Sequence, residues 1–423
     1  MTFFIMTFGC KANQADSAGI SALLKARGYE NVQAGEKTDI IILNTCAVTA
    51  ESVRKCRTQL RRAKKENPEA FVAICGCFSE LSPEEVLELG ADLVAGSKDR
   101  AGFVSALENA QKGLKQEAKQ GNITEFEVLP TAAVDGRTRA LLKIQDGCEN
   151  FCTYCIVPYA RGKVRSMKQE DTLLAVERLQ EQGYKEVVIT GIEISSWGKE
   201  FDGSLHHLLA EICKGAPDMR IRLGSLEPRT ITENFCDSLK GFDNLCGHFH
   251  LSLQSGSDAI LKQMGRKYTS ERYMQSLTLL RKYFPNCAIT TDIIVGFPGE
   301  TEAQFRESVE FVTKAQFADI HVFPYSKRTG TKAANMPNQI EKTEKTKRGK
   351  EMRILAKKQR SAFLHTQLGK RVPVLFETEK EGVSIGYTPN YCQVEVVGNK
   401  LENEVKWVDL QAVNDEKLAG LLI

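Results

Sequence analysis

The sequence has no apolar run that approaches the roughly 18 consecutive residues of a transmembrane helix, so we expect no association with a membrane. Its first residues carry no basic region and reach Cys10 too soon for a signal peptide. The 13 cysteines are an odd number in a chain of 423 residues, which argues against a secreted disulfide framework. The net charge of +3 is too small to indicate an acidic or a basic partner. These absences favour a cytoplasmic protein with reduced thiols.

The densest group of cysteines also lacks a fourth member nearby. Cys148, Cys152 and Cys155 have the spacing C-x3-C-x2-C in a loop directly after an apolar run. Three thiolates can bind three irons of a [4Fe–4S] cluster and leave the fourth iron open, whereas an electron-transfer cluster usually takes four cysteines. Structural zinc is the alternative, but zinc sites normally add a second cysteine pair or histidines, and His206 and His207 lie far down the chain. We therefore expect an iron–sulfur cluster here.

The first 112 residues alternate strand-like and helix-like segments, which predicts a doubly wound parallel sheet. The expected strands are residues 2–7, 39–44, 70–75 and 92–95, and the expected helices are residues 17–27, 52–65 and 83–89.

Three further cysteines follow successive strands of this predicted sheet. Cys10, Cys46 and Cys77 each come just after a strand, and ligands of open α/β sheets bind beyond the carboxyl ends of the strands. The alternative is that they are small buried hydrophobic residues, which is our interpretation of Cys56 and Cys75. The repetition at three strand ends favours metal ligands that meet on one rim.

After an expected linker at residues 113–136, with a possible strand at 125–129, a second alternation runs through residues 137–365. It predicts a partial (βα)6 barrel rather than a closed eight-stranded barrel. The expected strands are residues 140–145, 186–190, 220–223, 248–253, 288–295 and 319–323, and the expected helices include 171–182, 205–214, 270–283 and 302–314. Polar or glycine-rich residues follow each strand, which is where a barrel keeps its active site. No serine and histidine arrangement predicts a hydrolase triad.

Past Thr331 the chain changes character. Residues 339–371 contain 11 Lys or Arg against three Glu, a local charge of +8 that suggests either a solvated helix face or a surface for phosphates. Residues 366–423 contain short alternating runs at 372–377, 382–387, 393–397 and 404–410, which predict a small all-β barrel. Small β-barrels often bind RNA, although many bind nothing.

Long ordered motifs across nearly the whole chain resemble the methylthiotransferase family of radical S-adenosylmethionine (SAM) enzymes. These motifs are residues 7–14 (TFGCKANQ), 44–48 (NTCAV), 76–77 (GC), 148–162 (CENFCTYCIVPYARG), 250–257 (HLSLQSGS), 264–269 (MGRKYT), 292–301 (DIIVGFPGET) and 323–326 (FPYS). The resemblance implies two [4Fe–4S] clusters, a radical-SAM cluster on Cys148, Cys152 and Cys155 and an auxiliary cluster on Cys10, Cys46 and Cys77. It also implies a C-terminal TRAM module for RNA at about residues 366–423.

The same resemblance implies a mechanism and a set of SAM contacts. Reductive cleavage of SAM would give a radical that permits substitution at an unactivated C–H, with sulfur from the auxiliary cluster and an electron donor such as a flavodoxin or ferredoxin. Tyr154 occupies the position where the superfamily has an aromatic residue. The other expected SAM contacts follow the barrel strands: Gly191, Glu193, Ser225, Glu227, Gln254 and Gly296.

Two motifs, residues 223–228 (LGSLEP) and 386–391 (GYTPNY), resemble the subgroup that methylthiolates N6-threonylcarbamoyladenosine at position 37, beside the transfer RNA anticodon. Met167 and residues 191–195 depart from the usual pattern, and both concern substrate or SAM contacts. The alternatives are another transfer RNA adenosine that carries an isopentenyl group, a ribosomal protein, or a non-catalytic iron–sulfur protein that binds RNA or senses redox state. We expect Cys213, Cys236, Cys246, Cys287 and Cys392 to be core thiols.

Overall fold

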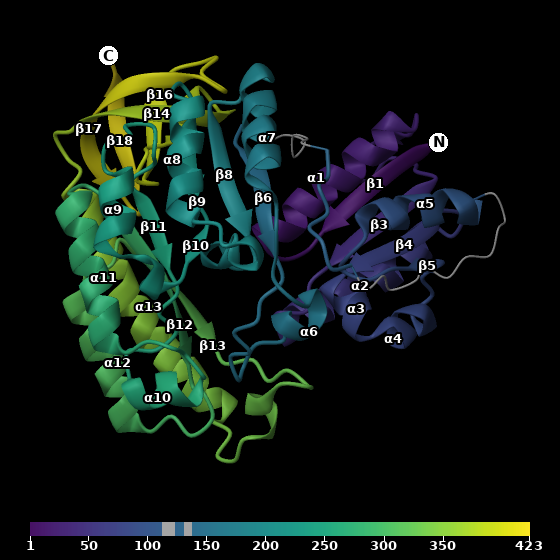
Figure 1. Cartoon of the computed structure of the whole chain (residues 1–423), viewed down its shortest axis with the longest axis horizontal. Coiled ribbons are helices and arrows are strands. Elements are labelled where there is room, and N and C mark those ends of the chain that lie inside the picture. Colours follow the sequence, from purple (N-terminus) through teal and green to yellow (C-terminus); the bar gives the residue numbers. More distant parts are fainter. Residues whose placement is uncertain (112–122, 131–137) are drawn as a thin grey trace.

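The computed structural model describes residues 1–111, 123–130 and 138–423, and Figure 1 shows their arrangement. A first α/β unit lies beside a curved β/α unit, and a small β-barrel caps one end of the curved unit. The expected fold class is therefore confirmed.

The first unit is a parallel sheet with strand order β2-β1-β3-β4-β5, covered by helices on both faces. Its strand β3 alternates between the two cores: Ile40 and Ile42 pack on one face, and Ile41 and Leu43 pack on the other. Because both faces are covered, residues 40–43 of this strand form a continuous apolar run. The strands are β1 (Thr2–Thr7), β2 (Glu30–Asn31), β3 (Ile40–Thr45), β4 (Phe71–Gly76) and β5 (Leu93–Val94), and the helices are α1 (Lys11–Ala26), α2 (Ala50–Glu66), α3 (Cys77–Leu81), α4 (Pro83–Glu88) and α5 (Arg100–Gln111).

The curved unit consists of two four-stranded sheets, β7-β6-β8-β9 and β10-β11-β12-β13, joined by a bridge between Ile221 and Leu245. Apart from the short antiparallel β7, the strands are parallel, as expected for a partial barrel. The strands are β6 (Ala140–Asp146), β7 (Arg165–Ser166), β8 (Glu186–Gly191), β9 (Arg220–Leu223), β10 (Ser225–Leu226), β11 (His248–Leu251), β12 (Ala288–Val295) and β13 (Asp319–Pro324).

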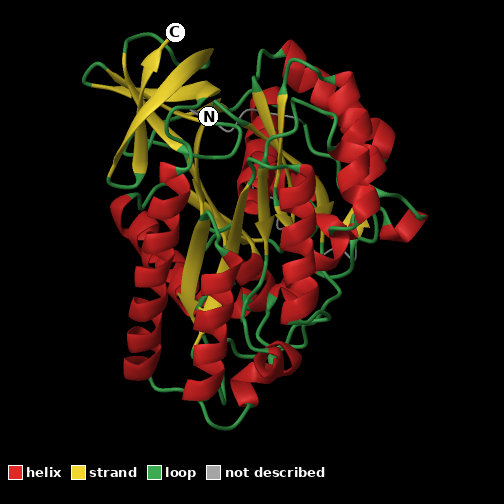
Figure 2. Cartoon of the chain, turned by 90° about the vertical axis from the view of Figure 1, so that its left-hand side faces the viewer, coloured by secondary structure: helices red, strands yellow, loops and turns green. Residues whose placement is uncertain are grey.

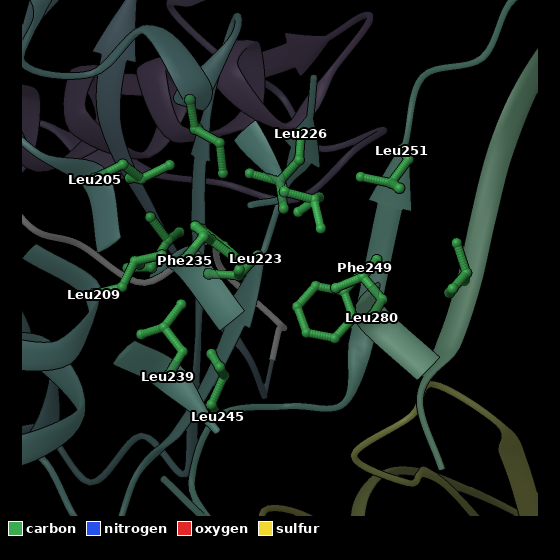
Figure 3. Packing of buried hydrophobic residues seen from close by; sticks show 14 of the residues in the cluster. Leu205, Leu209, Leu223, Leu226, Phe235, Leu239, Leu245, Phe249, Leu251 and Leu280 are labelled. Carbon is green, nitrogen blue, oxygen red and sulfur yellow. The ribbon is translucent and has the colours of Figure 1, made fainter. Parts of the chain in front are cut away.

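Helices cover the outside of this arc, as Figure 2 shows. Their inner faces and the strands share a core of leucine and phenylalanine side chains, part of which appears in Figure 3 around Leu223, Phe235 and Phe249. Side-chain caps fix several helix starts; Thr301, for example, forms a reciprocal capping box with Gln304 at the start of α12. The helices are α6 (Val157–Arg161), α7 (Gln169–Glu181), α8 (Leu205–Gly215), α9 (Glu233–Leu239), α10 (Asp258–Gln263), α11 (Ser270–Tyr283), α12 (Glu302–Ala315) and α13 (Lys342–His365).

The C-terminal segment forms a closed barrel with strand order β14-β15-β16-β18-β17. It covers the amino ends of the curved sheet, where Arg220 and Arg222 donate hydrogen bonds to the carbonyl oxygens of Tyr387 and Pro389. The sequence-based prediction missed the last strand, because the run KLAGLL lacks clear alternation. The strands are β14 (Arg371–Lys380), β15 (Val383–Tyr387), β16 (Gln393–Val397), β17 (Val405–Asn414) and β18 (Lys417–Leu422).

The expected strand at 125–129 is wrong. These residues form no ladder. Instead, the Glu127 carboxylate accepts hydrogen bonds from the backbone N–H groups of Arg100 and Ala101, at 2.9 and 2.7 Å, and so caps the start of α5. Most of the expected linker at 113–136 lies outside the described residues. Within the described residues, no helix is long and apolar enough to cross a membrane.

Candidate metal centres

The loop that carries Cys148, Cys152 and Cys155 follows β6, at the carboxyl end of the curved sheet. Gly147 begins it with a φ of 75°, and an added Cβ there would overlap the carbonyl oxygen of Lys163, so only glycine fits. The backbone N–H of Cys148 donates to the carbonyl oxygen of Gly162 at 3.1 Å. The N–H of Thr153 donates to the carbonyl oxygen of Met264 at 2.9 Å, which ties the loop to the end of α10.

The environment of these three thiols suits an iron–sulfur cluster. Arg266 is partly buried, and its guanidinium donates a hydrogen bond to the Cys152 Sγ at 3.5 Å. Burial raises the pKa of Cys155 to about 12 and also raises that of Cys148, so neither thiol would lose its proton unaided. A bound metal deprotonates a coordinating thiol outright. The residues present therefore fit a metal–sulfur centre, and the Arg266 guanidinium can balance the negative charge of its sulfurs.

Cys10, Cys46 and Cys77 lie at the carboxyl ends of β1, β3 and β4, which are neighbours in the sheet. Cys10 is the residue directly before α1. Asn13 holds two of the loops together, because its Nδ2 donates to the carbonyl oxygens of Phe8 and Thr45 at 2.9 and 2.8 Å. Burial is the main reason why the pKa of Cys46 rises to about 12, and the charges of Cys77 and Cys10 raise it further. The three thiols therefore lie close to one another. The structure thus brings the trio together on one rim.

Arg161, at the end of α6, connects the two cysteine groups. Its side chain is fully buried, and its Nε donates to the Cys77 Sγ at 3.3 Å. Its two amino groups donate to Asp16 at 2.9 Å, to Asp146 at 3.1 Å and to Asn13. Because α6 begins two residues after Cys155 and packs on α3, which begins at Cys77, the two cysteine groups face a common boundary between the units.

Both carboxylates of this network remain charged. Burial raises the pKa of Asp146, but Arg161 and Lys143 outweigh burial and hold the pKa at about 2. Burial likewise raises the pKa of Asp16, and the surrounding cations Lys143, Arg100 and Arg161 together move it well below its usual range. Separating the first unit from the curved unit would break the ion pairs of Asp16 with Arg161 and Lys143.

A cavity of about 540 Å³ lies inside the curved sheet, with walls from all three units. The first unit contributes Cys10 and Lys11, and α13 contributes Arg360. The curved sheet contributes Thr190, Gly191, Leu223, Gly224, Ser225, His248, His250, Ala288, Thr290, Asp292, Asp319 and His321, and the C-terminal barrel contributes Tyr387, Asn390, Tyr391 and Gln393.

The seven expected SAM contacts divide into groups. Gly191 and Ser225 line the cavity. Glu193 lies near Cys148, and its buried Oε1 has no hydrogen-bond partner, which suits the amino group of a ligand. Tyr154 packs partly buried against Phe297 and Met264.

The other three expected contacts have local structural roles. Glu227 forms an ion pair with Arg229 at 2.8 Å. Gln254 has a φ of 71° and pairs with β12 through its backbone, since its N–H donates to the carbonyl oxygen of Asp292 at 2.8 Å. An added Cβ at Gly296 would overlap the side chain of Lys345, so this glycine allows α13 to approach.

Sequence reasoning gave no role to Arg161 or Arg266, although both lie within the motifs YARG and MGRKYT. Position in a motif was the available signal, but only the folded chain shows that each guanidinium contacts a cysteine sulfur.

A parallel sheet unit with three strand-end cysteines, joined to a partial barrel with a C-x3-C-x2-C loop, defines a radical-SAM enzyme. The model of the Radical SAM superfamily matches residues 142–312, and that of the Uncharacterized protein family UPF0004 matches residues 2–96. The threonylcarbamoyladenosine tRNA methylthiotransferase MtaB of Bacillus subtilis is 37% identical over 93% of this chain and 90% of its own length. The MtaB of Thermotoga maritima is 36% identical over 98% of this chain and 95% of its own.

A second kind of relative has nearly the same identity to this chain. The tRNA-2-methylthio-N(6)-dimethylallyladenosine synthase of Clostridium tetani is 36% identical over 97% of this chain and 93% of its own length. The chain therefore belongs to the radical-SAM tRNA methylthiotransferases, which use SAM and [4Fe–4S] clusters.

Solved structures support the fold alone. The radical SAM methyltransferase TsrM from Kitasatospora setae, with cobalamin and a [4Fe-4S] cluster bound, has a TM-score of 0.57 at 14% identity, covering 79% of this chain and 77% of its own. The cobalamin-dependent SAM radical enzyme OxsB with aqua-cobalamin bound has a TM-score of 0.56 at 16% identity, covering 84% of this chain and 56% of its own.

Proposed function

We propose that this protein transfers a methylthio group to C2 of N6-threonylcarbamoyladenosine at position 37 of transfer RNA. One observation carries the choice of substrate. The two segments that resemble the threonylcarbamoyladenosine subgroup, residues 223–228 and 386–391, are distant in sequence, yet both contribute walls to the cavity that contains Cys10. A segment that faces the same cavity as a sulfur centre is well placed to select the nucleoside.

In this proposal the two cysteine groups have different tasks. Cys148, Cys152 and Cys155 hold the radical-SAM cluster, and Cys10, Cys46 and Cys77 hold the auxiliary cluster. When bound, these clusters would supply the electron that cleaves one SAM and the sulfur that is transferred, and a second SAM would supply the methyl group. Arg266 and Arg161 balance the charge of the cysteine sulfurs through their hydrogen bonds to Cys152 and Cys77.

The remaining expected SAM contacts would orient the cofactor along the strand ends. Glu193 offers its unpartnered carboxylate oxygen to the SAM amino group. Gly191 and Ser225 border the cavity. Tyr154, Glu227, Gln254 and Gly296 remain proposed contacts that lie outside its lining.

The anticodon stem-loop would bind across the C-terminal barrel and α13. Many lysines of α13 are exposed and suit phosphate contacts, while Arg348 is buried against Glu300 at 2.8 Å and serves the fold. Unstacked loop bases can be splayed into a pocket, and the cavity reaches Tyr387 and Tyr391 of the barrel. We take residues 1–112, 137–365 and 366–423 as the functional domains of a cytoplasmic enzyme, reduced by a flavodoxin-like or ferredoxin-like protein.

The substrate is tested by nucleoside mass spectrometry of transfer RNA from cells with and without the gene. We expect deletion to remove 2-methylthio-N6-threonylcarbamoyladenosine and to leave its unmethylthiolated precursor. The dimethylallyladenosine relatives make the isopentenyl nucleoside the second candidate, because their identity to this chain is as high. Loss of the isopentenyl product, or an unchanged nucleoside profile with a modified ribosomal protein, would refute the proposed substrate.

The assignment of the cysteines is tested with two variants. We expect Cys10→Ala to abolish methylthiolation but keep some conversion of SAM to 5′-deoxyadenosine, because the radical-SAM cysteines are intact. Cys152→Ala should abolish both. If the anaerobically reconstituted, reduced wild type forms no 5′-deoxyadenosine, the protein is a non-catalytic iron–sulfur protein instead.

A further inference from the structure

Three side chains from adjacent strands converge inside the cavity, away from all six cluster cysteines in sequence. They are His250 on β11, Asp292 on β12 and His321 on β13. One ligand atom of each lies within 4.8 Å of those of the other two. His250 Nε2 and Asp292 Oδ2 are 3.3 Å apart. Two imidazoles and one carboxylate form a ligand set typical of zinc and of non-haem iron.

The ring of His250 is held in the orientation that metal binding needs. Its Nδ1 lies 3.0 Å from the Thr290 hydroxyl oxygen. That hydroxyl also lies 3.2 Å from Nε2 of His248. If Thr290 donates to His248 and accepts from His250, the proton of His250 is on Nδ1 and its Nε2 lone pair faces Asp292 and His321. A metal-binding histidine usually donates its other ring N–H to an oxygen in this manner.

The site is open to ligands from the cavity. Asp292 is 28% exposed and His250 is 13% exposed, while His321 is exposed on the cavity wall. Ligand atoms around one zinc ion lie about 3.4 Å apart, which is close to the 3.3 Å between His250 Nε2 and Asp292 Oδ2. The cavity also contains Lys11 and Arg360, but Asp319 adds a second carboxylate to its wall. The charge of the lining therefore does not exclude a cation.

We propose that His250, Asp292 and His321 bind one divalent transition-metal ion, such as zinc. Three protein ligands leave at least one coordination position directed into the cavity, as in catalytic rather than structural zinc sites. The site uses none of the six cluster cysteines, and it does not depend on which nucleoside the enzyme modifies.

The test measures metal content rather than turnover. Anaerobic holoenzyme with both clusters assembled is dialysed against micromolar zinc, and zinc and iron per chain are measured by mass spectrometry. We expect about one zinc per chain in the wild type. His321→Ala and Asp292→Asn should each lose it, while His207→Ala, an exposed histidine on α8, should retain it. Iron per chain must stay equal in all four proteins, which shows that zinc does not occupy the cysteines.

A fourth variant tests the role of the hydroxyl. Thr290→Val removes the acceptor for His250 Nδ1 but no ligand, and loss of such a supporting contact weakens metal binding by about 10–100-fold. Zinc titrations with a competing chelator measure this shift, with His207→Ala as reference. The proposal is overturned if the wild type binds no zinc, or if His321→Ala and Asp292→Asn bind as much zinc as His207→Ala.

Discussion

Replacing Arg161 by methionine should destabilise the contact between the first unit and the curved unit. The fully buried guanidinium donates to Asp16 at 2.9 Å and to Asp146 at 3.1 Å. Removing one partner of a buried ion pair costs about 3–5 kcal/mol, because the opposite charge stays in a medium of low polarity. Asp16 keeps Arg100 at 3.0 Å and also Lys143, and Asp146 keeps Lys143 at 3.2 Å. We therefore expect the lower end of that range.

A loss of about 3 kcal/mol corresponds to a fall of about 3 °C in the unfolding temperature, because a chain of 423 residues has an unfolding entropy of about 0.9 kcal/mol/K. Differential scanning calorimetry of anaerobic protein measures it, with Arg62→Met as the matched control. Arg62 pairs with Glu66 on the surface of α2, so its replacement should hardly change the unfolding temperature. If Arg161→Met melts within about 1 °C of the wild type, the buried network contributes no net stability and the argument fails.

Three other results follow from the structure. The anaerobically reconstituted protein should contain about eight irons per chain, and a value near four in colorimetric iron analysis would contradict a second cluster. Gly147→Ala should lose much of the iron bound by the Cys148 loop, because the added Cβ overlaps the Lys163 carbonyl oxygen. The control Gly28→Ala should keep its iron, because Gly28 also has a positive φ, of 85°, but no atom lies within 4 Å of the added Cβ. Burial raises the pKa of Glu186, but Arg222 and Arg220 outweigh burial and hold the pKa below its usual range. The charged Glu186 therefore stabilises the fold above about pH 4.3, and this stabilisation is lost as the pH falls further. Unfolding temperatures at pH 6 and pH 3.5 should therefore differ less in Glu186→Gln than in the wild type, and equal differences would show that Glu186 does not titrate this way.

Features encoded in short segments could be predicted from the sequence. The strand ends that carry Cys10, Cys46 and Cys77 follow from local alternation plus the rule that parallel strands end on one edge. The ends of β12 and α11 agree with expectation because β-branched residues and a Thr269 cap mark them clearly. In each case the deciding residues lie next to the feature.

Features that depend on tertiary packing could not be predicted in this way. Glu127 caps a helix that begins 27 residues earlier in the chain, so its extended segment resembles a strand but pairs with none. Arg161 finds Asp16 across a separation of 145 residues. The convergence of His250, Asp292 and His321 depends on the register between three strands, which alternation alone does not fix.

The buried contacts of Arg161 also restrict how the molecule can move. A partial barrel has an open side, and here the unit with Cys10 closes it through charged groups that water does not reach. A hinge at that boundary would have to break the ion pairs of Asp16 with Arg161 and Lys143 together, so the two units should behave as one rigid body. Admission of a bulky ligand would then require displacement of the C-terminal barrel or of individual side chains, and hydrogen exchange should be slowest along α1 and β6.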